Sequence, residues 1–292
     1  MNTSTTHSSD NTDKAAVAAR RIHQGEKGEV EFLSILQEAL TQPGIVNAAY
    51  RAFWNYSIGN QILAAMQLTA RGLALSPIAS FNAWKDKGRS VKKGQKAISL
   101  FMPVSVRRKE KNEASSVEAE AEAGEGGAFN IFRLRANWFS LDQTEGAEFV
   151  PEVVAPTWDA ATALAALGIT EEPFQSLQGN VLGYATTHRS IAISPLNPLK
   201  HKTRFHEMAH IVLGHTDETG MTDTPTTPRD LREAEAEGVA YILCALLDLP
   251  GQAESRNYIQ SWLDGRELPE KSARKVFGAA DRIVKAGQPL GH

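Results

Sequence analysis

The chain has 292 residues, about twice the ~150 residues that one domain usually occupies, so we expect two domains. Its apolar fraction of 42% is typical of a globular protein, and its apolar runs are far shorter than the ~18 residues that a membrane-spanning helix needs. The single cysteine, Cys244, excludes an intramolecular disulfide and a cysteine-based metal site. Residues 1–13 are polar, lack the apolar core of a signal peptide and are expected to be disordered. These features favour a cytoplasmic protein with no membrane partner.

The net charge of −3 is unevenly distributed along the chain. Residues 1–150 carry 18 basic and 16 acidic residues, whereas residues 151–292 carry 13 and 18. Between Phe81 and Lys111 there are ten basic and only two acidic residues. The region that follows, 110–127, is rich in Glu, Ala and Gly and is expected to form a mobile acidic loop. A strongly basic segment beside an acidic one favours a polyanionic partner; the alternative is a solvated surface with a solubilising insert.

Hydrophobic periodicity and turn residues predict the following elements in chain order. Helices are expected over 30–40, 50–71, 158–167, 202–213, 229–247 and 273–285. Strands are expected over 97–106 and 129–141, joined by the acidic loop, with shorter strand pieces over 183–194. The Pro-rich stretch 150–157 suggests a boundary between domains over 14–150 and 151–292. The predicted fold class is α+β, with an N-terminal α+β domain followed by a mainly α domain that carries a small sheet.

Residues 206–210 read HEMAH, an HExxH motif within a predicted helix. His206 and His210 are four residues apart and project from one helix face, so both imidazoles can bind one metal ion. Glu207 can take a proton from a metal-bound water, whose pKa the metal lowers. The alternatives are a helix with two surface histidines, or a metal site that no longer catalyses a reaction.

A third protein ligand is needed, and two regions offer one. His215 lies one residue before the position at which a third histidine ligand would follow the motif. It is more simply placed at the helix C-terminus, and it remains the alternative ligand. The later segment 232–238, REAEAEG, offers glutamates on a helix. Glu233 and Glu237 share a face, so we expect Glu233 to bind the metal and Glu237 to orient a ligand histidine. Glu235 points away from them and is expected to be solvated. Zn²⁺ is the default metal for this ligand set, with Mn²⁺ or Co²⁺ as alternatives.

Aromatic residues, cations and glycines alternate over 50–56 and 81–96, as in surfaces that bind single-stranded nucleic acid. Gly88 and Gly94 are expected in tight turns, and no groove-reading motif is present. The residues predicted to contact DNA are Trp54, Trp84, Lys85, Lys87, Arg89, Lys92, Lys93, Lys96, Arg107 and Arg108. For the two tryptophans, packing in the core is the alternative.

Three stretches of the chain resemble ArdC-type antirestriction proteins. Residues 60–102, with "G-x-x-V-x-K-G-x-K" leading into a strand, and residues 138–146 (WFSLDQTEG) resemble the N-terminal domain of that family. The second half resembles the zincin-like metallopeptidase domain that follows there, in which an "E-x-x-A-E" helix comes after HExxH; Glu233, Ala236 and Glu237 fit that pattern. The resemblance implies a plasmid or other mobile-element protein, used in conjugation, that binds single-stranded DNA and protects incoming DNA from host restriction. The acidic insert is not part of the pattern.

Three functions are therefore open. In the first, the N-terminal domain binds single-stranded DNA, and the metal domain is secondary. In the second, the metal domain is a gluzincin-like endopeptidase that cleaves a protein, such as a component of the host restriction system, with Glu207 as general base. In the third, the metal is structural and no reaction is catalysed. A fourth protein ligand such as His215 favours the third function, and an open coordination position argues against it.

Overall fold

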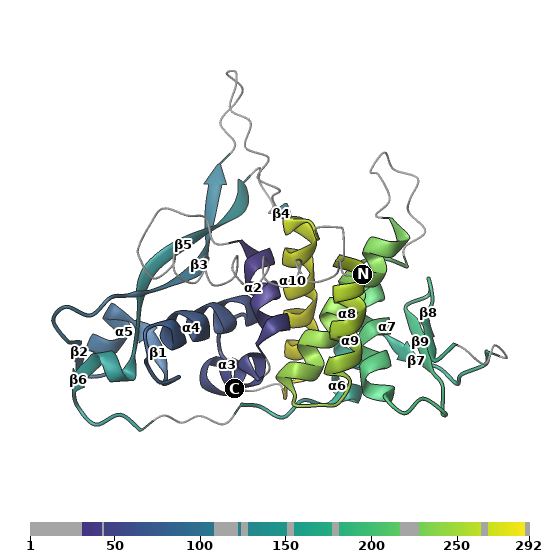
Figure 1. Cartoon of the computed structure of the whole chain (residues 1–292), viewed down its shortest axis with the longest axis horizontal. Coiled ribbons are helices and arrows are strands. Elements are labelled where there is room, and N and C mark those ends of the chain that lie inside the picture. The colour runs from purple at the N-terminus through teal and green to yellow at the C-terminus, as the bar shows by residue number, and fades with distance from the viewer. Residues whose placement is uncertain are drawn as a thin grey trace, which may run out of the picture. The chain divides into compact units, whose positions relative to one another are not determined.

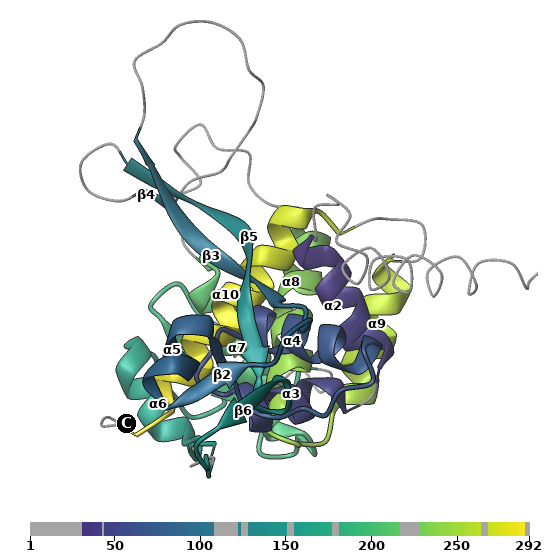
Figure 2. The same cartoon turned by 90° about the vertical axis from the view of Figure 1, so that its left-hand side faces the viewer.

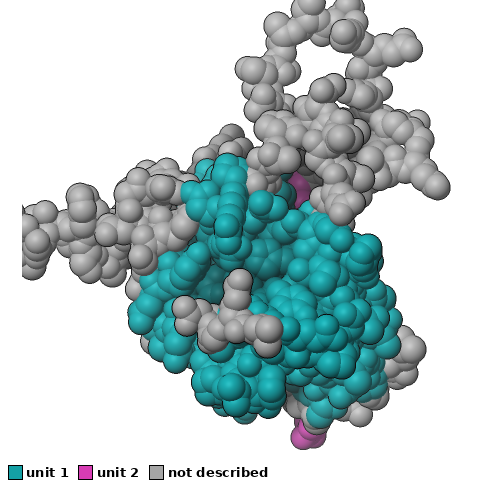
Figure 3. Space-filling model, turned by 90° about the vertical axis from the view of Figure 1, so that its right-hand side faces the viewer, with its two compact units in different colours: residues 1–62, 152–292 teal, residues 63–151 magenta. Residues whose placement is uncertain are grey.

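The computed structural model describes residues 31–42, 44–107, 122–123, 128–150, 155–176, 181–216, 228–263 and 268–289. The tail predicted to be disordered, residues 217–227 and most of the predicted acidic loop lie outside the described residues. The chain divides into two compact units, one formed by residues 1–62 and 152–292 (unit 1) and one by residues 63–151 (unit 2) (Figure 3). Among the described residues no helix is long and apolar enough to cross a membrane.

Unit 2 is built on a long antiparallel ribbon of two strands (Figures 1 and 2). Its elements are the end of α4 (Ile58–Ala70), β1 (Ile78–Ser80), α5 (Phe81–Asp86), β2 (Arg89–Val91), β3 (Ile98–Arg107), β4 (Glu122–Ala123), β5 (Ala128–Ser140), the 3-10 turn η1 (Leu141–Gln143) and β6 (Thr144–Gly146). β5 is flanked by β1 and β3, β4 pairs with β5, and β2 pairs with β6 in a second small sheet. Gln67 of α4 donates to the carbonyl of Ser99 at 2.8 Å and accepts from its N–H at 2.9 Å, so one amide side chain ties α4 to β3.

Unit 1 is mainly helical and contains one small sheet. Its elements are α2 (Phe32–Thr41), α3 (Ile45–Phe53), the start of α4, α6 (Ala160–Leu167), β7 (Thr170–Glu171), β8 (Gly183–Ala185), β9 (Ser190–Ile193), α7 (Lys200–Val212), α8 (Arg229–Leu246), α9 (Gln252–Leu263) and α10 (Glu270–Ala286). Helix α8 packs against α7, α9 and α10, and α7 also contacts β8 and β9 (Figure 1). In the sheet, β9 lies between β7 and β8, so β8 is at an edge. From Ala234 to Leu246 every residue of α8 is buried, which makes α8 the centre of the unit.

Carboxylates of α10 cap two helices from the start of the chain. Glu270 accepts the backbone N–H groups of Phe32 and Leu33 at 3.0 and 2.9 Å, at the N-terminus of α2. Asp281 accepts the N–H of Ile58 at 2.9 Å, at the N-terminus of α4. The first N–H groups of a helix have no partner within it, so these carboxylates satisfy donors that would otherwise be unpaired.

The same early helices are tied to α8. The buried hydroxyl of Tyr241 donates to the carbonyl of Ala39 at 2.6 Å, and Asn47 donates to the carbonyl of Leu246 at 2.9 Å. Packing thus groups residues 31–62 with the C-terminal half, which differs from the expected division into 14–150 and 151–292. The difference arises from contacts some 200 residues apart in sequence, which no local pattern reveals. That residues 14–150 form one domain that binds single-stranded DNA stays a prediction.

We expect Asp281→Asn to change the pH dependence of stability. Burial raises the pKa of Asp281 to about 6 from 3.8, against the smaller opposing effects of the Ile58 N–H and Lys285. A raised pKa means that this group stabilises the fold below pH 3.8 and that its contribution is lost as the pH rises through 6. The amide of Asn can accept the same N–H without a charge. The variant should therefore gain stability relative to the wild type between pH 4.5 and 7.5, by at most about 3 kcal/mol.

Denaturant unfolding at both pH values, with a chelator present to exclude metal effects, measures this gain. Asp159→Asn is the matched control. Asp159 caps α6 by accepting the N–H of Thr162 at 2.7 Å, and hydrogen bonds from Thr162 lower its pKa from 3.8. Its effect should therefore be the same at pH 4.5 and 7.5. If the difference in stability between the wild type and Asp281→Asn does not change with pH, the raised pKa of Asp281 is contradicted.

The predicted fold class, α+β with a mainly helical second half and a small sheet, is confirmed. The single helix expected over 50–71 is wrong: the chain breaks between Phe53 and Ile58, because α4 starts anew where Asp281 caps it. The short α5 and the helix α9 were not predicted from the sequence. Gly88 and Gly94 do lie at turns with φ of +72° and +85°, which a residue with a side chain rarely adopts.

Candidate metal centre and basic surface

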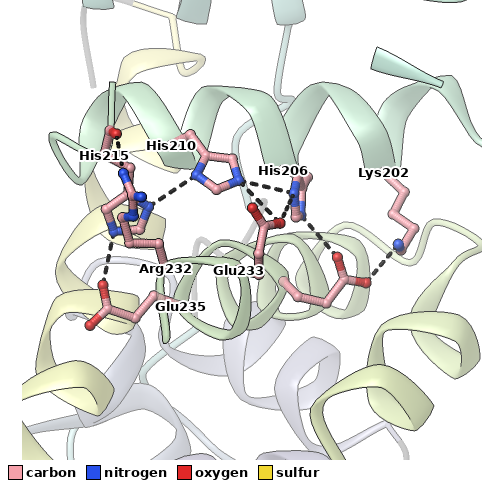
Figure 4. A network of polar contacts seen from close by, with 8 residues as sticks. Lys202, His206, His210, His215, Arg232, Glu233 and Glu235 are labelled. Carbon is pink, nitrogen blue, oxygen red and sulfur yellow. Dashed lines mark hydrogen bonds and ion pairs between the residues drawn. The ribbon is translucent and has the colours of Figure 1, made fainter. Parts of the chain in front are cut away.

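Helix α7 presents the HExxH motif toward the N-terminal part of α8 (Figure 4). The Nε2 atoms of His206 and His210 lie 3.1 Å apart. Oε2 of Glu233, from α8, lies 3.4 Å from the first of these nitrogens and 3.6 Å from the second. The structure thus brings together the three residues that the sequence singles out as metal ligands, and it does so on two packed helices.

The spacing of these three atoms suits a metal ion. Donor atoms in a tetrahedral site with bond lengths of about 2.0–2.1 Å lie about 3.3–3.4 Å from one another. The three observed separations of 3.1, 3.4 and 3.6 Å bracket that value. Two imidazole nitrogens and one carboxylate oxygen are donors that Zn²⁺ and its neighbours in the first transition row accept. The residues present therefore fit a divalent metal.

The other ring nitrogen of His206 is held by a buried carboxylate. Nδ1 of His206 lies 2.9 Å from Oε2 of Glu237, and Oε1 of Glu237 lies 2.6 Å from Nζ of Lys202. Burial acts to raise the pKa of Glu237, but His206 and Lys202 outweigh it and lower the pKa to about 2. The structure thus places Glu237 where the sequence predicts it, behind a ligand histidine, and adds Lys202, which the sequence analysis did not single out.

Glu207 lies on the inner side of α7, next to the edge strand β8. Its side chain is buried, and a Cβ on Gly183 of β8 would lie 3.3 Å from its Oε1 and 2.5 Å from Cγ2 of Thr203. Only glycine at position 183 leaves this space for the carboxylate. Burial raises the pKa of Glu207, although His206 and His210 oppose the shift. A buried carboxylate with a raised pKa, one residue from a metal-binding histidine, can accept and return protons.

One expectation about this region is wrong. Glu235 is not solvated but completely buried, with Oε2 2.9 Å from Nε2 of His215. His215 does not offer a nitrogen to the metal: its Nδ1 lies 3.0 Å from Nδ1 of His210, on the side of that ring away from the ligand atoms. His215 does lie just beyond the C-terminus of α7, as expected, and burial lowers the pKa of its ring from 6.5. Helical spacing alone places Glu235 on the outside, but α10 covers that side of α8.

In unit 2 the predicted lysines are exposed. We define the lysine cluster as Lys85, Lys87, Lys92, Lys93 and Lys96. Lys92 donates to the carbonyl of Asp142 at 2.9 Å, and Lys87 lies 5.5 Å from the centre of the Phe149 ring. Within the described part of the chain, the structure gives no ion pair between these lysines and a carboxylate. Their charges are therefore available to an anionic partner.

The remaining residues predicted to contact DNA differ from the lysines. Trp84 is 1% exposed and its Nε1 donates to the carbonyl of Phe139 at 2.8 Å, so it has no face open to a base. Arg89 is also occupied, because its Nε donates to the hydroxyl of Thr144 at 2.8 Å and its Nη2 to the carbonyl of the same residue at 3.2 Å. Trp54 is half-buried and belongs to unit 1. The side chain of Arg107 and the whole of Arg108 lie outside the described residues.

Trp84→Phe should therefore destabilise unit 2 without changing its surface. The substitution removes a buried hydrogen bond and part of the edge-to-face contact with Phe149, whose ring centre lies 5.3 Å away. A loss of roughly 1–3 kcal/mol is expected from such a change. Thermal unfolding measures it, and DNA affinity well below the transition should match that of the wild type. A tenfold loss of DNA affinity with unchanged stability would show that Trp84 contacts bases after all.

Two arginines on the ribbon were missed by the sequence analysis. Arg133 and Arg135 are exposed and lie two positions apart on β5, so they project from the same face of the strand. They are paired in register with Met102 and Leu100 of β3, and no described carboxylate forms an ion pair with them. Alternation of Arg with apolar residues in the FRLRAN segment was the available signal.

Comparisons with known proteins match the two halves of the chain to two different families. Residues 14–134 match the family described as the N-terminal domain of anti-restriction factor ArdC, and residues 166–254 match the IrrE N-terminal-like domain, a peptidase family. A search among curated proteins gave no match.

One solved structure shows a similar fold, and a second structure of the same protein was also matched. The Mn(II)-bound crystal structure of the antirestriction ArdC protein from plasmid R388 has a TM-score of 0.52 and 18% identity, over 95% of this chain and 99% of that one. The metal-free structure of that protein has a TM-score of 0.47 and 21% identity, over 94% and 95% of the two chains. With an ArdC N-terminal domain followed by an IrrE-like domain, the chain has the two-domain organisation of the ArdC-type antirestriction proteins.

Proposed function

We propose that this protein is a cytoplasmic antirestriction factor of a mobile element. It binds single-stranded DNA without sequence preference and protects incoming DNA, for example plasmid DNA in conjugation, from host restriction. The observation that carries the proposal is the lysine cluster, five exposed cations that lack carboxylate partners among the described residues, within the stretch that matches the ArdC N-terminal domain. Ammonium groups without carboxylate partners can neutralise phosphates and release counterions, which drives binding to any sequence.

The surroundings of the cluster favour binding to the backbone rather than to base edges. Gly88 and Gly94 lie at turns between these lysines, where backbone can approach a phosphate closely. Arg133 and Arg135 add two exposed cations to the same unit. Phe132 of β5 is 48% exposed and projects from the face of the strand opposite to the two arginines.

Titration of fluorescent oligonucleotides tests this function. Single strands of different composition should bind with similar affinity, more tightly than a duplex of the same length, and the affinity should fall steeply as salt rises. Binding that is independent of salt would exclude the lysine cluster as its source. A strong preference for one sequence would require contacts to base edges and would contradict backbone binding.

We further propose that His206, His210 and Glu233 bind one divalent metal ion in this chain. Support comes from the spacing of the three donor atoms and from the Mn(II)-bound structure of the R388 protein. Zn²⁺ is the default for two imidazoles and a carboxylate, and Mn²⁺ or Co²⁺ fit the same donors. The metal would supply a Lewis acid, while Glu207 would move protons beside it.

A metal-dependent endopeptidase is the second candidate function. The observation that favours it is the position of Glu207, buried between the metal-binding helix α7 and the edge strand β8. An edge strand can pair with an extended peptide through its free backbone groups, which would bring a peptide bond to the carboxylate. In this function the N-terminal domain delivers the peptidase to DNA, and a protein of the host restriction system is the substrate. Cleavage of such a protein by the wild type but not by Glu207→Gln would establish it.

A further inference from the structure

The end of helix α7 returns the chain to one of the predicted ligand histidines. Gly214 has φ +74°, its N–H donates to the carbonyl of Ile211 at 3.2 Å, and the N–H of His215 donates to the carbonyl of His210 at 2.8 Å. This pair of bonds defines a Schellman motif, which brings the side chain two positions beyond the helix end against the last turn. In most helices that contact is apolar. Here it joins two imidazole rings, whose centres lie 5.2 Å apart.

A chain of hydrogen bonds leads from this contact into the interior. Nδ1 of His210 lies 3.0 Å from Nδ1 of His215, and Nε2 of His215 lies 2.9 Å from Oε2 of Glu235 on α8 (Figure 4). Arg232 fixes the backbone of His215 by donating to its carbonyl at 3.0 Å. The ligand atom of His210, Nε2, is at the opposite end of this chain.

The positions of the protons follow from the acceptor at the inner end. A carboxylate can only accept, so Nε2 of His215 carries a proton and donates to Glu235. In the neutral ring Nδ1 of His215 is then an acceptor, so the proton between the two rings belongs to Nδ1 of His210. His210 with its proton on Nδ1 has a free lone pair on Nε2, which is the form that binds a metal.

Burial makes this arrangement hard to replace by water. The side chain of His215 is 4% exposed and that of Glu235 is 0% exposed. Lys275 of α10 places Nζ 3.8 Å from Oε1 of Glu235. Lys275 thus places a positive charge beside the buried carboxylate of Glu235, which accepts from His215.

We propose that His215 and Glu235 are positioning residues that fix the tautomer and orientation of His210 for metal binding. The proposal rests on the metal site proposed above. The two ligand histidines would then be supported differently, His206 directly by Glu237 and Lys202, and His210 through a second histidine by Glu235 and Lys275. The sequence signature is H-x-x-x-G-H at the end of the motif helix, followed by a glutamate on the next helix.

Substitutions at His215 separate this role from a structural one. His215→Leu removes both hydrogen bonds of the ring. In His215→Asn the amide oxygen can take the place of Nδ1 and accept from His210, although the link to Glu235 is lost. Competition with a chromogenic chelator for Zn²⁺ should show about 10–100-fold weaker binding for the Leu variant. The Asn variant should recover most of that affinity, although both variants lose stability.

Tyr241→Phe is the matched control. It also removes two hydrogen bonds of a residue of α8, one donated to the carbonyl of Ala39 and one accepted from Arg256, and should lower the thermal stability of the metal-free protein without changing its Zn²⁺ affinity. Wild-type affinity in the folded His215→Leu variant, or equal losses in the Leu and Asn variants, would overturn the proposal. Histidine ¹⁵N spectra of the metal-free protein add a test that needs no metal. They should show the Nδ1–H form of His210 in the wild type and a changed tautomer in His215→Leu. The positioning role of His215 is therefore tested even if the wild type binds no Zn²⁺.

Discussion

Replacing His206 by Ala is expected to reduce bound divalent metal from one ion per chain to near zero. The substitution removes one of three donor atoms that lie within 4.8 Å of one another. The two donors that remain, on His210 and Glu233, do not hold an ion firmly. It also leaves Glu237 paired with Lys202 alone. Elemental analysis of the purified protein after dialysis against Zn²⁺ or Mn²⁺ measures the stoichiometry.

His188→Ala is the matched control for this experiment. His188 is an exposed residue of the same unit, in the turn between β8 and β9, and it is not among the residues that could hold a metal. This variant should retain one ion per chain. Full metal content in His206→Ala would disprove the ligand set, and loss of metal in His188→Ala would show that binding is not confined to the three residues.

The second large effect is expected in unit 2, from a variant in which Lys92, Lys93 and Lys96 are all replaced by Gln. Each phosphate contact contributes about 0.7 to the slope of log affinity against log salt for single strands, so the slope should fall by about 2. At moderate salt this corresponds to a loss of affinity of roughly 10–100-fold, equal for all sequences. Fluorescence anisotropy at several salt concentrations measures both quantities.

The control variant replaces Lys200, Lys271 and Lys285 by Gln. These lysines are exposed in unit 1, so the net charge of the protein changes by the same amount. If the lysine cluster carries binding, the control should bind DNA nearly as the wild type does. Equal losses in the two variants would mean that overall charge, and not this cluster, determines affinity. A change in sequence preference would point to base contacts.

The arrangement of the three proposed ligands could be predicted because helix geometry is local. Two histidines four residues apart must share a face, and Glu233 and Glu237 must share one too, so the only unknown was whether α7 and α8 pack together. They do, and the predicted positions of Glu233 and Glu237 relative to His206 follow from that contact. The strands β3 and β5 and the small sheet were predictable for the same reason, since alternation and turn residues are local signals.

The errors arise where a partner comes from a distant part of the chain. Nothing near Glu235 in sequence shows that α10 will cover it, and nothing near Ile58 shows that Asp281 will cap a new helix there. Trp84 illustrates a different difficulty: an aromatic residue among lysines fits a stacking surface and a core equally well, and only its hydrogen bond to Phe139 decides. The role of His215 needed the conformation of Gly214, which the sequence permits but does not specify.

The most direct test of the proposed function is protection of transferred DNA in cells that carry an active restriction system. The wild type is compared with the Lys92, Lys93 and Lys96 triple variant and with Glu207→Gln, which is expected to leave the metal ligands and the lysine cluster in place. If binding to single-stranded DNA carries the function, protection should be lost in the triple variant and should survive in Glu207→Gln. Full protection by the triple variant would contradict this account. Loss of protection in a Glu207→Gln protein that still binds DNA would also contradict it and would identify chemistry at the metal centre as the function.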